Sequence, residues 1–144
     1  MNIKVYYHSS TGNTGKLADE VAQTLNIVAE PISKNSAVIS KTIDLLFLGD
    51  GVYFGKPHKD TISFISSLNP QKVRNVAVFG TYGGQRNIGT DIQKMLTDRR
   101  INVLENPFLA KGQSWVFINR KHPDQTDLEN IRSYARWAVS RITT

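Results

Sequence analysis

The sequence predicts an α/β fold, with residues 1–144 forming one domain in which helices cover both faces of a doubly wound, five-stranded parallel sheet. Three observations support this prediction. Strand-like apolar segments alternate along the chain with segments that are apolar at helical spacing. The run from Ile43 to Leu48 is continuously apolar, which is typical of a central strand buried on both faces. Finally, two Gly- and Tyr-rich loops follow predicted strands, where open α/β sheets bind ligands.

The first half of the chain supplies three of the predicted strands. A strand over residues 2–8 leads into a helix over 13–25, whose apolar residues share one helix face. A short strand follows over 26–32, and then a weak helix or turn over 35–41. The apolar run of residues 43–48 is the third and central strand.

The second half of the chain repeats the alternation. Residues 58–68 and 87–99 place apolar side chains at helical spacing and are predicted helices. Strands are predicted over 73–79 and 101–109, because both segments are rich in apolar and β-branched residues.

Two local signals add detail near the carboxyl terminus. Pro107 is expected to bend the fifth strand. A capping box from Thr126 to Glu129 is expected to start the last helix, whose apolar residues recur at helical spacing as far as Ile142.

The loop between the first predicted strand and helix is small and polar. Its residues are Ser9, Ser10, Thr11, Gly12, Asn13 and Thr14. The first N–H groups of a helix lack internal partners, and the helix dipole places partial positive charge there. The loop is therefore a predicted phosphate site built from N–H groups and hydroxyls.

Two familiar nucleotide motifs do not fit the sequence. The nucleoside-triphosphate loop would need a glycine at Ser10 and a hydroxyl at Leu17. The dinucleotide fingerprint fails because Gly49, Gly51 and Gly55 are spaced one residue too widely.

The first loop and its flanks instead resemble the flavodoxin family. That family has an apolar and aromatic strand end, a hydroxyl-rich T-G-N-T-like loop, and a helix with alanine and an aliphatic residue at fixed offsets. The matching residues are Val5, Tyr6, Tyr7, Ser9, Gly12, Thr14, Ala18 and Val21. The resemblance implies the strand order 2-1-3-4-5 and FMN as cofactor. Because no long insertion interrupts the fifth strand, the short-chain subgroup is the better likeness.

The resemblance also implies where the flavin ring lies. In flavodoxins the loops after the third and fourth strands hold the ring between aromatic side chains, and these loops correspond here to residues 49–57 and 80–86. Tyr53 and Tyr82 are the candidates for the two ring faces, with Phe54 as a substitute. The expected FMN-binding residues are Ser9, Ser10, Thr11, Gly12, Asn13, Thr14, Asp50, Gly51, Val52, Tyr53, Phe54, Gly55, Thr81, Tyr82, Gly83 and Gly84.

Composition narrows the function classes. Without cysteine there is no disulfide, thiolate metal site or dithiol centre, so redox chemistry would need a bound cofactor. The amino terminus enters the first strand directly and no apolar run is long enough for a membrane span, so we expect a cytoplasmic protein without a signal or membrane segment.

The net charge of +6 departs from the acidic character of familiar flavodoxins. The 18 lysines and arginines are scattered without a nucleic-acid motif, so we expect no nucleic-acid partner. Complementary charge speeds association, which predicts redox partners with acidic docking surfaces or an anionic substrate. Lys56, Lys59 and Arg86 follow the predicted ring-binding loops and are candidates for the docking edge.

The leading functional prediction is a monomeric, low-potential electron-transfer flavoprotein without catalytic residues of its own. An FMN-dependent reductase of a quinone or other small acceptor is the enzymatic alternative, although no pyridine-nucleotide motif is present. A flavin-free receiver-like module would need an acidic cluster after the first strand, where His8, Ser9 and Ser10 stand instead. Nucleic-acid binding would rest on charge alone.

Histidine and aspartate give weaker signals. His8, His58 and His122 are far apart and lack metal-ligand spacing, so they are interpreted as ordinary surface or loop residues, and no metal site is predicted. Asp50 ends the central strand, where a turn or a hydrogen bond at the flavin edge is favoured over catalysis.

Overall fold

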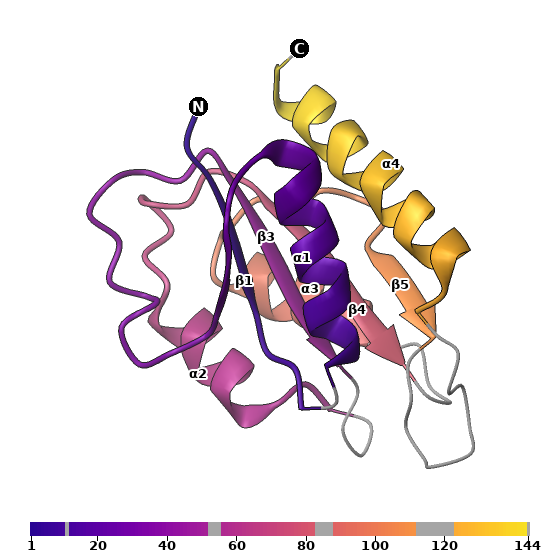
Figure 1. Cartoon of the computed structure of the whole chain (residues 1–144). Helices are drawn as coiled ribbons and strands as arrows, with labels where there is room; N and C mark the ends of the chain where they lie inside the picture. Colours follow the sequence, from indigo (N-terminus) through magenta and orange to yellow (C-terminus); the bar gives the residue numbers. More distant parts are fainter. Residues whose placement is uncertain (11, 52–55, 83–87, 112–122, 144) are drawn as a thin grey trace.

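The computed structural model describes residues 1–10, 12–51, 56–82, 88–111 and 123–143. All strand pairs are parallel, and the order is β2-β1-β3-β4-β5, as the sequence and its family resemblance predicted (Figure 1). The strands are β1 (Ile3–Tyr7), β2 (Ala29–Pro31), β3 (Leu45–Gly51), β4 (Val76–Tyr82) and β5 (Phe108–Lys111). The helices are α1 (Asn13–Leu25), α2 (Lys59–Ser67), α3 (Ile88–Asp98) and α4 (Gln125–Thr143).

Helices cover the two faces of the sheet as two pairs. Figure 1 shows α1 and α4 in front of the sheet, with α2 and α3 behind it. Each pair closes its own apolar cluster: Leu17 and Ile131 belong to the cluster of α1 and α4, whereas Phe64 and Ile92 belong to that of α2 and α3. The sheet thus lies between two separate cores, as the doubly wound fold requires.

Strand β3 contributes to both cores. All seven of its residues are buried. Leu45 and Phe47 face the cluster of α1 and α4, while Leu46 and Leu48 face the other cluster, because successive side chains of a strand point to opposite faces. Two-sided burial explains the unbroken apolar run, and the strand continues beyond the predicted end at residue 48 to Gly51.

The neighbouring strands β3 and β4 meet at an unusually close packing point. Gly49 lies beside Phe79 in the register. A Cβ atom at Gly49 would lie 2.3 Å from the Cε2 and Cζ atoms of Phe79, well inside contact distance. Glycine is therefore required at this position so that the Phe79 ring can fill the core.

The segment predicted as a weak helix or turn forms turns over residues 34–37, where the Ser33 amide donates to the Ser36 hydroxyl at 2.8 Å. Two predicted strands differ in detail. The second strand is confined to Ala29–Pro31. The predicted fifth strand is broken: Val103 forms an isolated bridge to Val76, and β5 begins only at Phe108. Pro107 immediately precedes β5 and has no N–H to donate to a strand ladder.

The capping box of α4 lies two residues earlier than predicted. The Asp127 amide donates to Asp124 Oδ1 at 2.9 Å, and the Asp124 amide donates to Asp127 Oδ2 at 2.9 Å. The capping box thus runs from Asp124 to Asp127, and the predicted box from Thr126 to Glu129 is wrong. Aspartate satisfies the same orphan N–H groups as the expected threonine and glutamate. No helix within the described ranges is long and apolar enough to cross a membrane.

Candidate functional site

Three chain segments converge at the carboxyl-terminal edge of the sheet, the lower edge in Figure 1. They are the start of α1 after β1, the end of β3 and the end of β4. The hydroxyl oxygens of Thr14 and Thr81 lie 2.8 Å apart, and both residues are buried. The last residue of the first predicted loop therefore lies beside the start of the third.

The corner between β1 and α1 is shaped by Gly12. Its φ of 89° lies in the left-handed region, which glycine adopts without the strain other residues incur. Its amide donates to the Ser9 hydroxyl at 3.0 Å, and its carbonyl accepts from the Lys16 amide at 3.0 Å. The first turn of α1 contains no acidic residue, and its N-cap residue, Gly12, has no side chain that could cap it. The positive end of the helix dipole is thus not neutralised by its own sequence.

Asn13 and Thr14 begin α1 with buried side chains, only 5% and 1% exposed. The Asn13 Nδ2 atom is buried and has no hydrogen-bond partner within the described part of the chain. A buried amide donor without a partner is costly unless a ligand accepts from it. Together with the uncapped helix end, this donor fits the phosphate of a bound nucleotide such as FMN.

Asp50 links the two ends of the second predicted loop, which follows β3. Its carboxylate is fully buried and accepts hydrogen bonds from the Gly51 amide at 2.7 Å and the His58 amide at 2.8 Å. Burial raises the pKa of Asp50 to about 6, while the Thr61 hydroxyl and the His58 and Gly51 amides offset part of that rise. Asp50 thus forms a buried link between β3 and the start of α2, whereas its hydrogen bond at the flavin edge stays a prediction.

The structure brings together two histidines that the sequence interpretation had kept apart. The rings of His8 and His58 stack with centroids 3.6 Å apart and planes at 11°. His8 Nδ1 lies 3.6 Å from Asp50 Oδ1, and burial lowers the pKa of His8, an effect that the charge of Asp60 partly offsets. His58 Nδ1 accepts from the Asp60 amide at 3.1 Å and so caps α2. Both histidines are half-buried, not ordinary exposed loop residues.

The described residues include part of the predicted FMN site. The end of β4 carries the half-buried Tyr82, one of the two predicted ring partners. The stacking of a flavin between Tyr53 and Tyr82 remains a prediction. The predicted residues that fall within the described ranges are Ser9, Ser10, Gly12, Asn13, Thr14, Asp50, Gly51, Thr81 and Tyr82. Those outside them are Thr11, Val52, Tyr53, Phe54, Gly55, Gly83 and Gly84.

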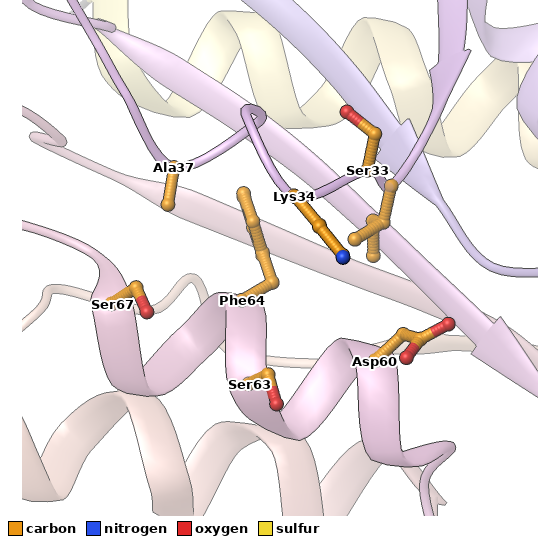
Figure 2. Close-up of a pocket in the computed structure, with 8 residues that line it drawn as sticks. Ser33, Lys34, Ala37, Asp60, Ser63, Phe64 and Ser67 are labelled. Atoms are coloured by element: carbon orange, nitrogen blue, oxygen red, sulfur yellow. The ribbon is translucent and has the colours of Figure 1, made fainter.

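A separate cavity lies between α2 and the segment that follows β2. Figure 2 shows its lining, with Lys34 and Ala37 on one side and the α2 residues Asp60, Phe64 and Ser67 on the other. Its volume is about 600 Å³. The cavity contains none of the predicted FMN-binding residues and was not foreseen from the sequence.

The strand order and the corner after β1 define a doubly wound α/β protein, a class that binds ligands at the carboxyl ends of its strands. The model of the flavodoxin domain family matches residues 4–114. The chain therefore belongs to the flavodoxin family, as its first loop indicated.

Similar proteins include one curated relative and several solved structures that share the fold. An uncharacterized protein of Methanocaldococcus jannaschii is 27% identical over 134 residues, covering 86% of this chain and 88% of the relative. The structure of a flavodoxin from the domain Archaea has a TM-score of 0.78 and 17% identity, with full coverage of both chains. Rubredoxin oxygen:oxidoreductase from Desulfovibrio gigas has a TM-score of 0.78 and 14% identity, covering 99% of this chain but 36% of that one.

Proposed function

We propose that this protein binds FMN and works as a low-potential electron carrier between redox partners. The observation that supports this most is the corner after β1, where a helix start with a glycine N-cap and the buried, unpartnered Asn13 donor lie together, as a phosphate site requires. Membership of the flavodoxin family supports FMN as the nucleotide. The same family membership supports the carrier role, and because the chain has no cysteine, its redox group would be the bound cofactor.

The chain's own residues hold and shield the cofactor in this proposal. Ser9, Gly12, Asn13 and Thr14 bind the phosphate through hydroxyl, amide and N–H donors. Bound FMN supplies one- and two-electron redox chemistry. Asp50 fixes the stems of the loop after β3, and that loop and the segment from Tyr82 onward cover the flavin ring and exclude water.

The basic charge of the chain favours acidic redox partners. Lys56 and Lys59 are exposed beside the second loop, next to the proposed flavin edge. Opposite charges at a docking surface raise association rates, and salt reduces the effect. Reversing both charges, Lys56→Glu with Lys59→Glu, should slow reduction of an acidic partner several-fold at low salt. Lys41→Glu is the control, because Lys41 is exposed at the opposite end of β3.

A reductase on the same fold is the second candidate. It is favoured by the similarity to part of a Desulfovibrio gigas protein whose name describes an oxidoreductase. The two functions differ in what the purified protein does alone. A carrier accepts electrons from a reductase or a chemical reductant but does not itself turn over NAD(P)H with a quinone, whereas a reductase does.

The experiment that tests the proposed function begins with the purified protein. We expect one FMN per chain, released by heat and identified by chromatography, and reversible reduction without steady-state oxidation of NAD(P)H. Steady turnover with NAD(P)H and a quinone would favour the reductase. A protein that neither retains nor accepts FMN would contradict both.

A further inference from the structure

Two imidazoles and a carboxylate lie close together at the start of α2. His8 follows β1, His58 caps α2, and Asp60 lies in the first turn of α2, at the helix end labelled in Figure 2. One ligand atom from each residue lies within 4.8 Å of those from the other two. We propose that His8, His58 and Asp60 form a binding site for a divalent transition-metal ion of the zinc class.

The donor set selects the type of ion. Two imidazole nitrogens with one carboxylate oxygen suit Zn²⁺ and its neighbours Co²⁺, Ni²⁺ and Cu²⁺. Mg²⁺ and Ca²⁺ prefer sites made entirely of oxygen. Three protein ligands leave a further coordination position for water or a small ligand, the pattern of exchangeable zinc sites.

Asp50 gives the site an outer partner of the kind that metal-bound histidines use. Its Oδ1 atom lies 3.6 Å from His8 Nδ1. This distance is too long for a hydrogen bond. If the His8 ring turns so that the distance closes, the carboxylate would hold the proton at Nδ1 and leave Nε2 of the same ring to the metal. Asp50 is itself fixed by the Gly51 and His58 amides, so it can position His8. The carboxylates of Asp50 and Asp60 together balance the charge of a divalent ion.

Coordination requires a local change of the two rings. A metal accepts the lone pair in the plane of each imidazole, whereas the His8 and His58 rings now lie nearly parallel. The two rings must therefore turn toward a common point. His58 either keeps the hydrogen bond that its Nδ1 accepts from the Asp60 amide and binds the ion through Nε2, or gives up that bond and binds the ion through Nδ1. This movement provides a direct readout, because metal binding should shift the ring C–H proton resonances of both histidines.

The bound ion would join parts of the chain that are distant in sequence. His8 lies at the end of β1, whereas His58 and Asp60 begin α2. The ion would therefore tie the end of β1 to the start of α2, in addition to the Asp50 link between β3 and α2. This inference goes beyond the proposed electron transfer, and it does not need flavin to be bound.

The test uses the whole purified chain after removal of metal with a chelator. Zn²⁺ affinity is measured by competition with a chromophoric chelator, and Co²⁺ binding is followed by its d–d absorption. We expect one ion per chain, shifts of the His8 and His58 resonances, and a higher melting temperature in excess Zn²⁺.

The variants are chosen to preserve the fold. His58→Asn keeps a side chain suited to the N-cap of α2, and Asp60→Asn keeps the shape of the carboxylate. Each should weaken Zn²⁺ binding by more than about tenfold, as should His8→Asn. Asp50→Asn should weaken it by about 10–100-fold, although Asp50 does not touch the ion. Melting curves without metal establish that each variant is folded.

Two control variants distinguish binding at this site from nonspecific metal binding elsewhere on the chain. His122→Gln removes the remaining histidine of the chain, and Asp98→Asn removes an exposed carboxylate on α3. Neither should change Zn²⁺ affinity. The proposal is overturned if the chain shows no saturable Zn²⁺ or Co²⁺ binding. Binding that persists in the His8, His58 and Asp60 variants would overturn it equally.

Discussion

Thr14 and Thr81 share a hydrogen bond of 2.8 Å between their hydroxyls, although they are 67 residues apart in sequence. Thr14 lies in the first turn of α1 and Thr81 near the end of β4, and both are buried. The bond therefore holds the proposed phosphate corner against the strand that leads to the third predicted loop. The bond thus links the stability of the fold to the geometry of the proposed phosphate site.

Replacing Thr81 with valine should destabilise the protein. Valine has nearly the same shape but leaves the buried Thr14 hydroxyl without this partner, which costs about 1–3 kcal/mol. Urea unfolding measures the change in free energy. The double variant with Thr14→Val should recover part of the loss, because both polar groups are then removed. Strictly additive losses would contradict the link between the two hydroxyls.

Gly49→Ala should be destabilising for a steric reason. The added Cβ would fall 2.3 Å from ring atoms of the buried Phe79, so the core must shift at a cost of about 1–3 kcal/mol. Combining it with Phe79→Leu should cost less than the sum of the two single substitutions. Thermal or urea unfolding of the four proteins completes the cycle. A Gly49→Ala protein as stable as the wild type would contradict the packing.

The observed start of α4 predicts a difference between two neighbouring residues. Asp124→Ala removes the side chain that accepts from the Asp127 amide, and should lower the free energy of unfolding by about 1 kcal/mol. Thr126→Ala, at an exposed position, should change it by less than about 0.5 kcal/mol. A larger loss of stability for Thr126→Ala than for Asp124→Ala would contradict the observed box and favour the one predicted from Thr126 to Glu129.

Tyr134 predicts a loss of stability at high pH. Burial raises the pKa of its phenol far above the ordinary value of 10.0, and its hydroxyl donates to the Val78 carbonyl at 3.2 Å. Below pH 10 the phenol is neutral in both the folded and unfolded states. Above pH 10 the unfolded chain loses the proton first, so unfolding becomes more favourable as the pH rises.

The matched variant for this effect is Tyr134→Phe. The difference in unfolding free energy between wild type and variant should be constant below pH 10. Above pH 10 the unfolding free energy of the wild type should fall relative to that of the variant. Urea titrations at a series of pH values measure that difference. A difference that stays flat through pH 10 and beyond would show that the phenol is not buried as described.

The parts of the fold that were predictable rest on signals within single segments. The two-sided burial of Leu45 to Leu48 was visible as an apolar run, and the corner from Ser9 to Thr14 matched a family pattern over consecutive residues. The late start of β5 at Phe108 was harder to predict, because Pro107 is compatible both with a bend in the strand, as predicted, and with the break that the structure shows.

The remaining features depend on contacts between distant segments. His8 and His58 are separated by a helix, two strands and their connections, so spacing along the chain gave no sign that their rings stack. The buried Asp50 link has the same origin, because the second donor arrives from the start of α2. Only the pairing of β1 with β3 brings these groups together.

The central claim is that the corner after β1 holds the phosphate of FMN. The most direct test compares FMN with riboflavin, which lacks the phosphate, in binding titrations of flavin-free wild type, Asn13→Ala and the control Thr24→Ala at the far end of α1. We predict that FMN binds more tightly than riboflavin, and that Asn13→Ala weakens FMN by about tenfold or more while leaving riboflavin and the control unchanged. Equal affinities for FMN and riboflavin, or no binding of either, would contradict the claim.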